Sequence, residues 1–316
     1  MNGEVAESVK NGPILLVMAA GMGSRYGGLK QMVPVGPSGE TLLDYSVFDA
    51  VRAGFSKVVF VVRRQFKEDF QKKIGAKFAS RIEVAYAEQE TDGLEEGYGI
   101  TINREKPLGT GHAVICAEPY LNGPFAVING DDFYGRESFL VLGNALRESS
   151  VEGHVDRSYM VGFVLDKTLS ENGGVSRGVC ECGEADYLVS IEECTSIKRT
   201  ERGIENVAAG KERQFTGKEW VSMNMWGFRA SISEYIRPLF HRFLRAFEHD
   251  PQAEFYIPNC VDQLVRDEQL RVLVMGTSET WLGLTYAEDR AKVVREVAGL
   301  VKADRYPKSL WDGGLE

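Results

Sequence analysis

An apolar run that ends in glycines constrains the fold of this chain most strongly. The segment ILLVMAA, residues 14–20, has the length of a strand and is followed by GMGSRYGGLK. A continuous apolar run without alternation is typical of a strand buried on both faces of a parallel sheet. Glycine N–H groups after such a strand can approach an anion closely, and Arg25 and Lys30 add positive charge nearby. The segment therefore predicts a phosphate-binding turn at the carboxyl edge of a parallel sheet.

Two common phosphate-binding fingerprints do not fit this turn. A dinucleotide fingerprint needs a third glycine where Tyr26 stands, and an acidic residue at the end of the second strand, which here ends at Arg63. A P-loop needs a lysine followed by Ser or Thr, but Lys30 comes one place late and precedes Gln31. The sequence thus argues against both an NAD site and a P-loop.

Strands and helices alternate over the first half of the chain. KVVFVV, IEVAYA and FAVIN are further strand-length apolar segments, and apolar residues recur at helical spacing between them. Such alternation predicts an α/β fold with a Rossmann-like, mostly parallel sheet that helices cover on both faces. Beyond residue 151, strands are separated by Gly, Asp and Glu clusters, which predicts a mixed β region on the edge of the parallel core. The polar stretch at residues 200–218 predicts a mobile loop, and helical patterns return at residues 232–247, 258–265 and 288–301.

Charge and apolar content exclude several function classes. There are 37 Lys and Arg against 46 Asp and Glu, a net charge of −9, which argues against binding to nucleic acid or an anionic membrane. The longest early apolar run is far shorter than the roughly 20 residues of a membrane span. The first twelve residues are polar and lack the pattern of a signal peptide, and the five cysteines show no repeated spacing. We expect a cytoplasmic enzyme.

Three segments resemble the nucleotidyltransferases that make nucleotide-sugars. AAG-x-G-S-R followed by a lysine resembles their signature loop, and the short step from Arg25 to Lys30 is similar to that of the molybdenum-cofactor branch. KPLGTGHAV, residues 106–114, resembles the base- and ribose-binding loop of N-acetylglucosamine-1-phosphate uridylyltransferases. AVINGDDFYG places two carboxylates at the end of a strand, where the family carries an aspartate that holds Mg²⁺.

The resemblance implies roles for individual residues. The catalytic set would be Arg25 on the β- and γ-phosphates, Lys30 on the α-phosphate, and Asp131 on Mg²⁺ as the metal ligand. The nucleotide would be bound by Ala20, Gly21, Gly23, Gln89, Gly109 and Thr110, and the sugar by Gly174, Glu193 and Asn224.

Near the C-terminal end of the resemblance, one position departs from the family pattern, and another matches it but also has a structural explanation. Gly283 stands where many members have a second aspartate for the metal, and Asp289 is retained but also suits the N-terminus of the last helix. The other segments are compatible with structural roles as well. These are a glycine turn with surface cations, a helix N-terminus at Thr110, and an Asp-rich turn at Asp131.

The resemblance also implies a domain plan, in the nucleotide-diphospho-sugar transferase fold. We expect residues 1–12 to form a flexible tail and residues 13–316 a single nucleotidyltransferase domain. Within it, residues 13–150 would be the nucleotide-binding half, 151–289 the sugar-binding half, and 290–316 a C-terminal helix and tail.

The implied reaction joins an NTP, with UTP favoured, to a sugar 1-phosphate and yields an NDP-sugar and pyrophosphate. Two alternatives stay open: a cytidylyltransferase acting on an alditol or choline phosphate, and a catalytically silent nucleotide- or sugar-binding regulator, which Gly283 motivates. The expected partners are the NTP and the sugar phosphate, with Mg²⁺ as cofactor. A homo-oligomer is compatible with the sequence.

Overall fold

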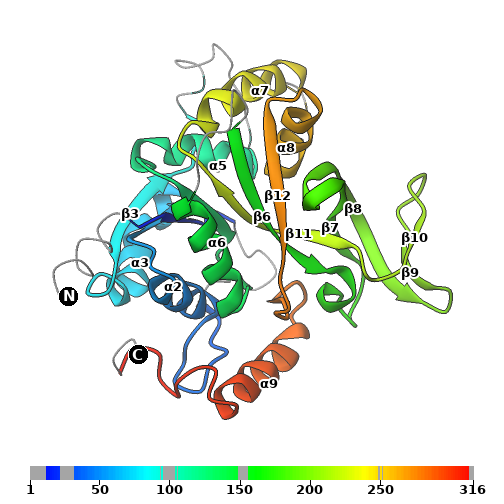
Figure 1. Ribbon diagram of the computed structural model, residues 1–316. Helices are drawn as coiled ribbons and strands as arrows, with labels where there is room; N and C mark the ends of the chain where they lie inside the picture. Colours follow the sequence, from blue (N-terminus) through cyan, green and yellow to red (C-terminus); the bar gives the residue numbers. More distant parts are fainter. Residues whose placement is uncertain are drawn as a thin grey trace.

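The computed structural model describes residues 12–21, 32–92, 94, 104, 106–148, 156–247, 250 and 252–312. These residues form an 11-stranded mixed sheet flanked by helices, and a small two-stranded sheet (Figure 1). The order along the main sheet is β10-β9-β8-β7-β11-β4-β1-β2-β3, with β6 beside β11 and β12 beside β6. The predicted α/β fold with a mixed β region is confirmed.

The parallel half of the sheet contains the predicted apolar segments. Its strands are β1 (Ile14–Met18), β2 (Lys57–Val62), β3 (Glu83–Glu88) and β4 (Phe125–Asn129). These strands pair with one another in parallel throughout. The side chains of β1 are buried towards both faces, as expected for a strand of continuous apolar residues.

Helices cover both faces of these strands. On one face α2 (Leu42–Arg52), α3 (Arg64–Lys73) and α6 (Arg136–Glu148) pack against alternate strand residues such as Leu15 and Val17. On the other face α5 (Thr110–Ala117), α7 (Ile232–Ala246) and α8 (Ile257–Arg266) pack with Ile14 and Leu16. Successive side chains of β1 point to opposite faces of the sheet, so each helical layer packs against its own set of apolar residues.

The order in which successive strands join the sheet reverses at β1, and this positions the site. Strands β2 and β3 lie on one side of β1, whereas β4 lies on the other. In open α/β sheets, ligands bind at such a switch point, beyond the carboxyl ends of the strands. The turn after β4 is fixed there, because the Gly130 N–H donates to the Met18 carbonyl at 3.0 Å. The glycines after β1 thus begin beside the aspartates after β4.

The mixed β region continues the same sheet. Strand β11 (Trp220–Phe228) is antiparallel to β4 and joins it to β6 (Asp156–Val164) and β7 (Val175–Cys182). Outside β7 lie β8 (Leu188–Thr200), β9 (Gly203–Asn206) and β10 (Arg213–Phe215), which extend from the body of the molecule in Figure 1. We had expected a loop at residues 200–218, and the hairpin of β9 and β10 corrects this.

The C-terminal part of the chain returns to the first helix of the parallel half. Strand β12 (Leu270–Gly276) pairs with β6, and β13 (Leu282–Gly283) pairs with β5 (Asp132–Phe133) next to the aspartate turn. Helix α9 (Asp289–Lys302) follows, and Tyr306 and Leu310 are buried against α2 in a third apolar cluster. The segment after α9 is thus part of the core.

Candidate active site

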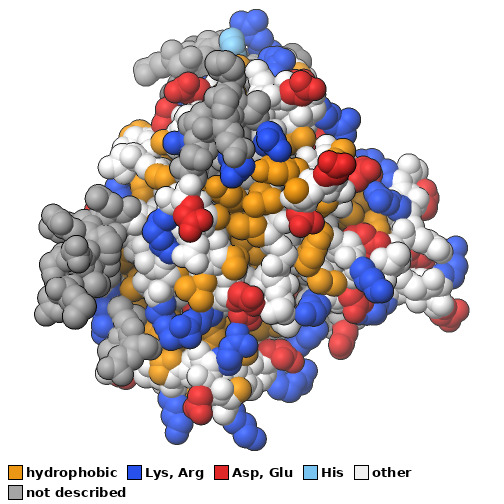
Figure 2. Space-filling view, in the orientation of Figure 1, with side chains coloured by type: hydrophobic (Ala, Val, Ile, Leu, Met, Phe, Trp, Pro, Cys, Tyr) orange, Lys and Arg blue, Asp and Glu red, His pale blue; other side chains and the backbone are white. Residues whose placement is uncertain are grey.

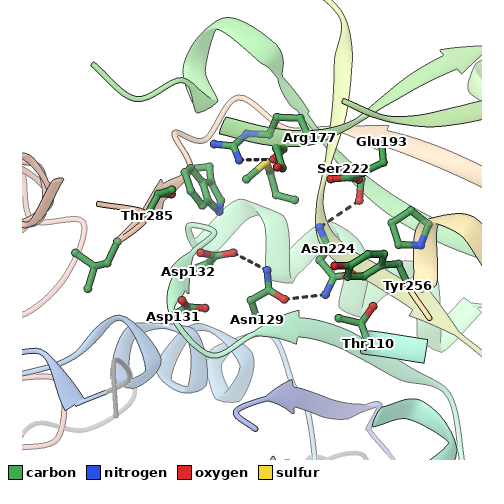
Figure 3. Close-up of a pocket in the computed structure, with 16 residues that line it drawn as sticks. Thr110, Asn129, Asp131, Asp132, Arg177, Glu193, Ser222, Asn224, Tyr256 and Thr285 are labelled. Atoms are coloured by element: carbon green, nitrogen blue, oxygen red, sulfur yellow. Dashed lines mark hydrogen bonds between the residues drawn. The ribbon is translucent and has the colours of Figure 1, made fainter. Parts of the chain in front are cut away.

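A cavity of about 410 Å³ lies at the switch point, between the end of β4 and strands β7, β8 and β11 (Figure 3). Four of the residues assigned from the sequence line it. These are Thr110, Asp131, Glu193 and Asn224. The structure therefore brings together segments that are more than a hundred residues apart. Its lining also includes Asn129, Asp132, Ser176, Arg177, Tyr256 and Trp281, which the sequence did not assign.

A chain of hydrogen bonds crosses the floor of this cavity. The Asn224 side chain donates to Asn129 Oδ1 at 2.8 Å, and Asn129 Nδ2 donates to Asp132 Oδ2 at 2.8 Å (Figure 3). Tyr134 supports the turn from below, since its hydroxyl donates to the Met223 carbonyl at 2.9 Å and accepts from the Asn129 N–H at 3.0 Å. The end of β4 is thus fixed relative to β11.

Asn224 lies at an irregularity in β11. The pairing of β11 with β6 shifts between Ser222 and Trp226, and Asn224 has a φ of 61°. Asparagine tolerates this left-handed conformation better than most residues, and a bulge turns a side chain towards a site. Its Oδ1 is buried without a hydrogen-bond partner among the described residues. A ligand hydroxyl or amide could donate to that oxygen.

The two aspartates of the turn have different surroundings. Asp132 is 6% exposed, and its Oδ2 accepts from Asn129 at 2.8 Å and lies 3.3 Å from the Tyr134 hydroxyl oxygen. Asp131 is half-buried and lies at the cavity, where Figure 3 shows it beside Asp132. Mg²⁺ is commonly held by one or two carboxylates together with phosphate oxygens and water. The donor chemistry of Asp131 fits such an ion, and no group of three or more His, Cys, Asp or Glu suited to a metal occurs among the described residues.

The departure at Gly283 has a steric reason. A Cβ at this position would lie 2.2 Å from the ring of Trp281 and 3.0 Å from Asp132 Oδ1. A carboxylate side chain at position 283 therefore has no room. Trp281 fills that space and stacks with the guanidinium of Arg177, whose Cζ lies 4.7 Å from the ring centroid.

Arg177 is the cation that the sequence did not single out. It is 5% exposed, and its guanidinium donates to Thr168 Oγ1 at 3.0 Å, to the Thr168 carbonyl, and to the Ser176 carbonyl at 2.6 Å. Burial lowers the pKa of Arg177 to about 10, while Asp132 and Glu193 act in the opposite direction. A guanidinium so placed keeps positive charge at the cavity wall. Two of these bonds go to Thr168, nine residues earlier, and the stacking ring of Trp281 is far away in sequence, so no local pattern distinguishes Arg177 from a surface arginine.

Glu193 lies across the cavity from the aspartate turn, on β8 (Figure 3). Burial raises the pKa of its carboxyl, and the positive charge of Arg177 opposes that shift. Gly174, expected to contact the sugar, is not among the residues lining the cavity, and its carbonyl accepts from the Tyr286 hydroxyl at 2.7 Å. Ser176, two residues along β7, lines the cavity instead.

The proposed base-binding residues lie close together, but some of their polar groups already form hydrogen bonds within the protein. Gln89 is buried, and its Nε2 donates to the Gly109 carbonyl at 2.8 Å. Gly109 has a φ of 98°, and a Cβ there would lie 2.7 Å from the Phe255 carbonyl oxygen. Thr110 Oγ1 accepts from the Ile257 N–H at 2.9 Å. These contacts show that the LGTGHA segment has a structural role, apart from any role in binding a base.

His112 in the same segment has a packing role. It stacks on Phe240 with ring centroids 4.9 Å apart, and burial lowers its pKa to about 4. A histidine in this state is neutral at physiological pH and lies away from the aspartate turn.

Of the remaining predicted residues, Ala20, Gly21 and Asp289 are described, and none of them lines the cavity. Ala20 is buried and Gly21 exposed just after β1, whereas Gly23, Arg25 and Lys30 lie outside the described residues. Asp289 accepts from Ser170 and Asn172 and from the Tyr286 N–H, at 2.8 to 2.9 Å. The latter bond is that of a carboxylate at a helix start, the structural role considered for Asp289.

Comparison with known proteins agrees with this geometry. Residues 15–128 match the MobA-like NTP transferase domain family. The UTP–glucose-1-phosphate uridylyltransferase YngB of Bacillus subtilis (strain 168) is 28% identical over 139 residues, which are 39% of this chain and 44% of that protein. The match thus spans less than half of the length of this relative.

A solved structure shares the fold over nearly the whole chain. It is that of a putative glucose-1-phosphate thymidylyltransferase from Bacillus anthracis in complex with a sucrose. The TM-score is 0.59 at 12% identity, over 90% of this chain and 95% of the other.

The chain therefore shares the fold of this solved structure, and residues 15–128 are similar to the MobA-like NTP transferase domains. The resemblance expected from the sequence is confirmed.

Proposed function

We propose that this protein catalyses transfer of a nucleotidyl group from an NTP to a sugar 1-phosphate, releasing pyrophosphate. The observation that carries the proposal is one cavity that has Asp131 on one side and Glu193 with Asn224 on the other (Figure 3). A carboxylate for a metal–triphosphate and hydrogen-bonding groups for a sugar thus face the same space.

The reaction needs alignment and charge neutralisation more than covalent chemistry from the protein. An oxygen of the sugar phosphate forms a bond to the α-phosphorus. The bond from that phosphorus to the bridging oxygen breaks, and its electron pair leaves with pyrophosphate. Both reactants are anionic, so groups that hold them in line and offset their charge lower the barrier. Bound Mg²⁺ would supply positive charge to the phosphates.

Each residue has a role within this proposal. Asp131 would hold Mg²⁺, and the Asn129–Asp132 hydrogen bond would keep the turn in place. Glu193 would accept hydrogen bonds from sugar hydroxyls, and Asn224 Oδ1 would accept another. Arg25 and Lys30, outside the described residues, would bind the β- and γ-phosphates and the α-phosphate. Gln89, Gly109 and Thr110 would bind the base.

UTP is the nucleotide that we favour. The LGTGHA segment resembles a uridylyltransferase loop, and the curated relative is by its name a uridylyltransferase that acts on glucose 1-phosphate. The cytidylyltransferase alternative predicts CTP with an alditol or choline phosphate. The silent regulator predicts binding without turnover, and it stays open because Trp281 and Asp132 leave no room for an aspartate at position 283.

The predicted location and partners agree with the composition. None of the helices in the described parts of the chain has both the length and the apolar character that a membrane crossing needs. In Figure 2 basic and acidic side chains are mixed over the visible face, without a continuous basic surface for nucleic acid. We keep a cytoplasmic enzyme without membrane or nucleic-acid partners as part of the proposal.

A pyrophosphate-release screen tests the proposal. Four NTPs are combined with a panel of sugar 1-phosphates, and with an alditol phosphate and choline phosphate, in the presence of Mg²⁺. We expect pyrophosphate with UTP and at least one sugar 1-phosphate. Release only with CTP and an alditol or choline phosphate would favour the cytidylyltransferase. Binding without release in every combination would favour the regulator.

A further inference from the structure

A second hollow adjoins the candidate active site on the side of β7 and β8. Its volume is about 760 Å³, larger than the 410 Å³ of the first. Glu193 and Tyr256 line both, so the two spaces meet at these side chains. In Figure 3 these two residues lie on the side of the site opposite Asp131 and Asp132. We call this second hollow the distal groove, bounded by β7, β8, β10 and α8.

The charges that line the distal groove balance. Arg213 pairs with Glu192 at 2.9 Å, and Arg266, at the α8 side, pairs with Asp262 at 2.7 Å. The Arg213 guanidinium also lies over the ring of Phe215. The charged lining residues are the cations Lys211, Arg213 and Arg266 and the anions Glu181, Glu192 and Glu193. The groove therefore has no surplus of positive charge that would select an anionic ligand.

Its polar groups suit hydroxyl groups instead. Ser190 Oγ donates to Glu181 Oε2 at 3.0 Å, and Thr195 and Asn259 add a hydroxyl and an amide. A sugar hydroxyl both donates and accepts, so it can use carboxylates, amides and hydroxyls in close succession. Apolar floor residues and the ring of Tyr256, which is 38% exposed, offer surface to the carbon-bound faces of a ring.

We propose that the distal groove binds the non-reacting end of the acceptor, and that this end is a neutral, hydroxyl-rich group of the size of a second sugar ring. The inference rests on the proposed function, in which Glu193 and Asn224 hold the sugar next to the phosphates. A substituent on that sugar, directed away from Asp131, passes Glu193 and Tyr256 and enters the groove. The acceptor is then a disaccharide-like glycosyl 1-phosphate.

Calorimetric titrations of matched acceptor pairs test this. Monosaccharide 1-phosphates and the corresponding disaccharide 1-phosphates, such as glucose 1-phosphate with maltose 1-phosphate, are titrated with and without Mg²⁺ and a non-hydrolysable UTP analogue. At least one disaccharide should bind about 10-fold or more tightly than its monosaccharide. No gain in any pair overturns the proposal. Tighter binding of glucose 1,6-bisphosphate than of every disaccharide also overturns it, because that result assigns an anion to the groove.

Filling the groove supplies the second readout. Thr195→Trp on β8 and Asn259→Trp on α8 replace exposed side chains that line the groove but not the first cavity. Each should abolish the gain of the disaccharide and leave monosaccharide affinity within about 2-fold of the original protein. Val189→Trp, an exposed β8 position outside the groove lining, is the matched control and should keep the gain. A gain that survives both filling variants contradicts the proposal.

The same proteins separate this inference from the proposed function. Pyrophosphate formation from an NTP and a monosaccharide 1-phosphate reports the reaction without using the groove. Turnover without any disaccharide gain leaves the reaction intact and removes the groove proposal. A groove-dependent gain without turnover supports the groove and refutes the reaction.

Discussion

Asp131 and Asp132 are neighbours in sequence, yet their carboxylates have different partners. Both line the cavity; Asp132 is the more buried of the two, and its carboxylate accepts from Asn129. Within the proposed function, Asp131 would hold the metal and Asp132 would keep the turn in place.

Asp131→Asn removes the charge that faces the metal and keeps the size of the side chain. We expect kcat to fall by about 100-fold or more, because the phosphates then lose an aligned source of charge neutralisation. Asp289→Asn should change kcat by less than about 5-fold, because that carboxylate bonds to Ser170, Asn172 and Tyr286. Steady-state kinetics on both variants, with circular dichroism as the check of folding, decides. Equal losses of activity would contradict the assignment.

Gly109→Ala tests the structural reason for the glycine in LGTGHA. Its φ of 98° is unfavourable for alanine, and a Cβ would also lie 2.7 Å from the Phe255 carbonyl oxygen. We expect the free energy of unfolding to fall by about 2–5 kcal/mol. Gly203→Ala is the matched control, since its φ is 116° but nothing lies within 4 Å of the Cβ position. It should cost only about 1–2 kcal/mol in urea unfolding. Similar losses at both positions would show that the contact with Phe255 is unimportant.

At the residue scale, the sequence predicted the groups that follow strands better than those that depend on distant packing. Asp131 follows an apolar strand at a sheet edge, which a reader of the sequence can see. Arg177 is held by Thr168, nine residues earlier, and by the ring of Trp281, which is far from it in sequence. Gly174 is the residue predicted to contact the sugar, whereas Ser176, two residues further along the chain, lines the cavity. The local sequence does not fix the register of a β-strand.

At the element scale, helix α2 and the segment after α9 share a buried polar contact. The Tyr306 hydroxyl donates to Asp49 Oδ2 at 2.6 Å, and Asp49 Oδ1 is buried without a partner among the described residues. Burial raises the pKa of Asp49 to about 7, and the hydrogen bond from Tyr306 opposes this shift. The carboxyl is therefore protonated more readily in the folded protein than in the unfolded chain.

This raised pKa predicts a pH-dependent stability. Between pH 4 and 7 the folded state keeps a proton on Asp49 that the unfolded state has released. The stability due to this group is thus present at low pH and is lost as the pH rises through about 7. Asp49→Asn retains an acceptor for Tyr306 but does not titrate. Relative to the original protein, this variant should gain about 2–4 kcal/mol on going from pH 4.5 to pH 8.

Urea unfolding at the two pH values measures the difference. Asp69→Asn, which alters an exposed pair with Lys73, should change stability by less than about 1 kcal/mol and show little pH dependence. An Asp49→Asn variant that follows the pH dependence of the original protein would contradict the account of this contact.

Among the elements, periodicity predicted the parallel strands and the last three helices closely. Helix α8, for example, spans Ile257–Arg266 where the pattern indicated 258–265. Strand β12 was not recognised, and the polar hairpin of β9 and β10 was taken for a loop. Short or polar strands are stabilised by their neighbours in the sheet more than by their own composition, so the sequence carries little signal for them.

At the scale of the whole molecule, one sheet joins the two predicted halves. Strand β11 is antiparallel to β4 and also pairs with β7, so the cavity forms where the parallel strands meet the mixed region. The alternation of strands and helices indicated this fold class. The alternation could not show that β11 inserts next to β4, because that pairing links residues about a hundred positions apart.

Pyrophosphate release tests the central claim most directly. The original protein, Asp131→Asn and Asp289→Asn are each mixed with UTP, Mg²⁺ and the panel of sugar 1-phosphates, and pyrophosphate is measured over time. The account predicts release that requires both UTP and a sugar 1-phosphate, is nearly abolished by Asp131→Asn, and persists in Asp289→Asn. Release that is unaffected by Asp131→Asn, or no release with any sugar 1-phosphate, would contradict it.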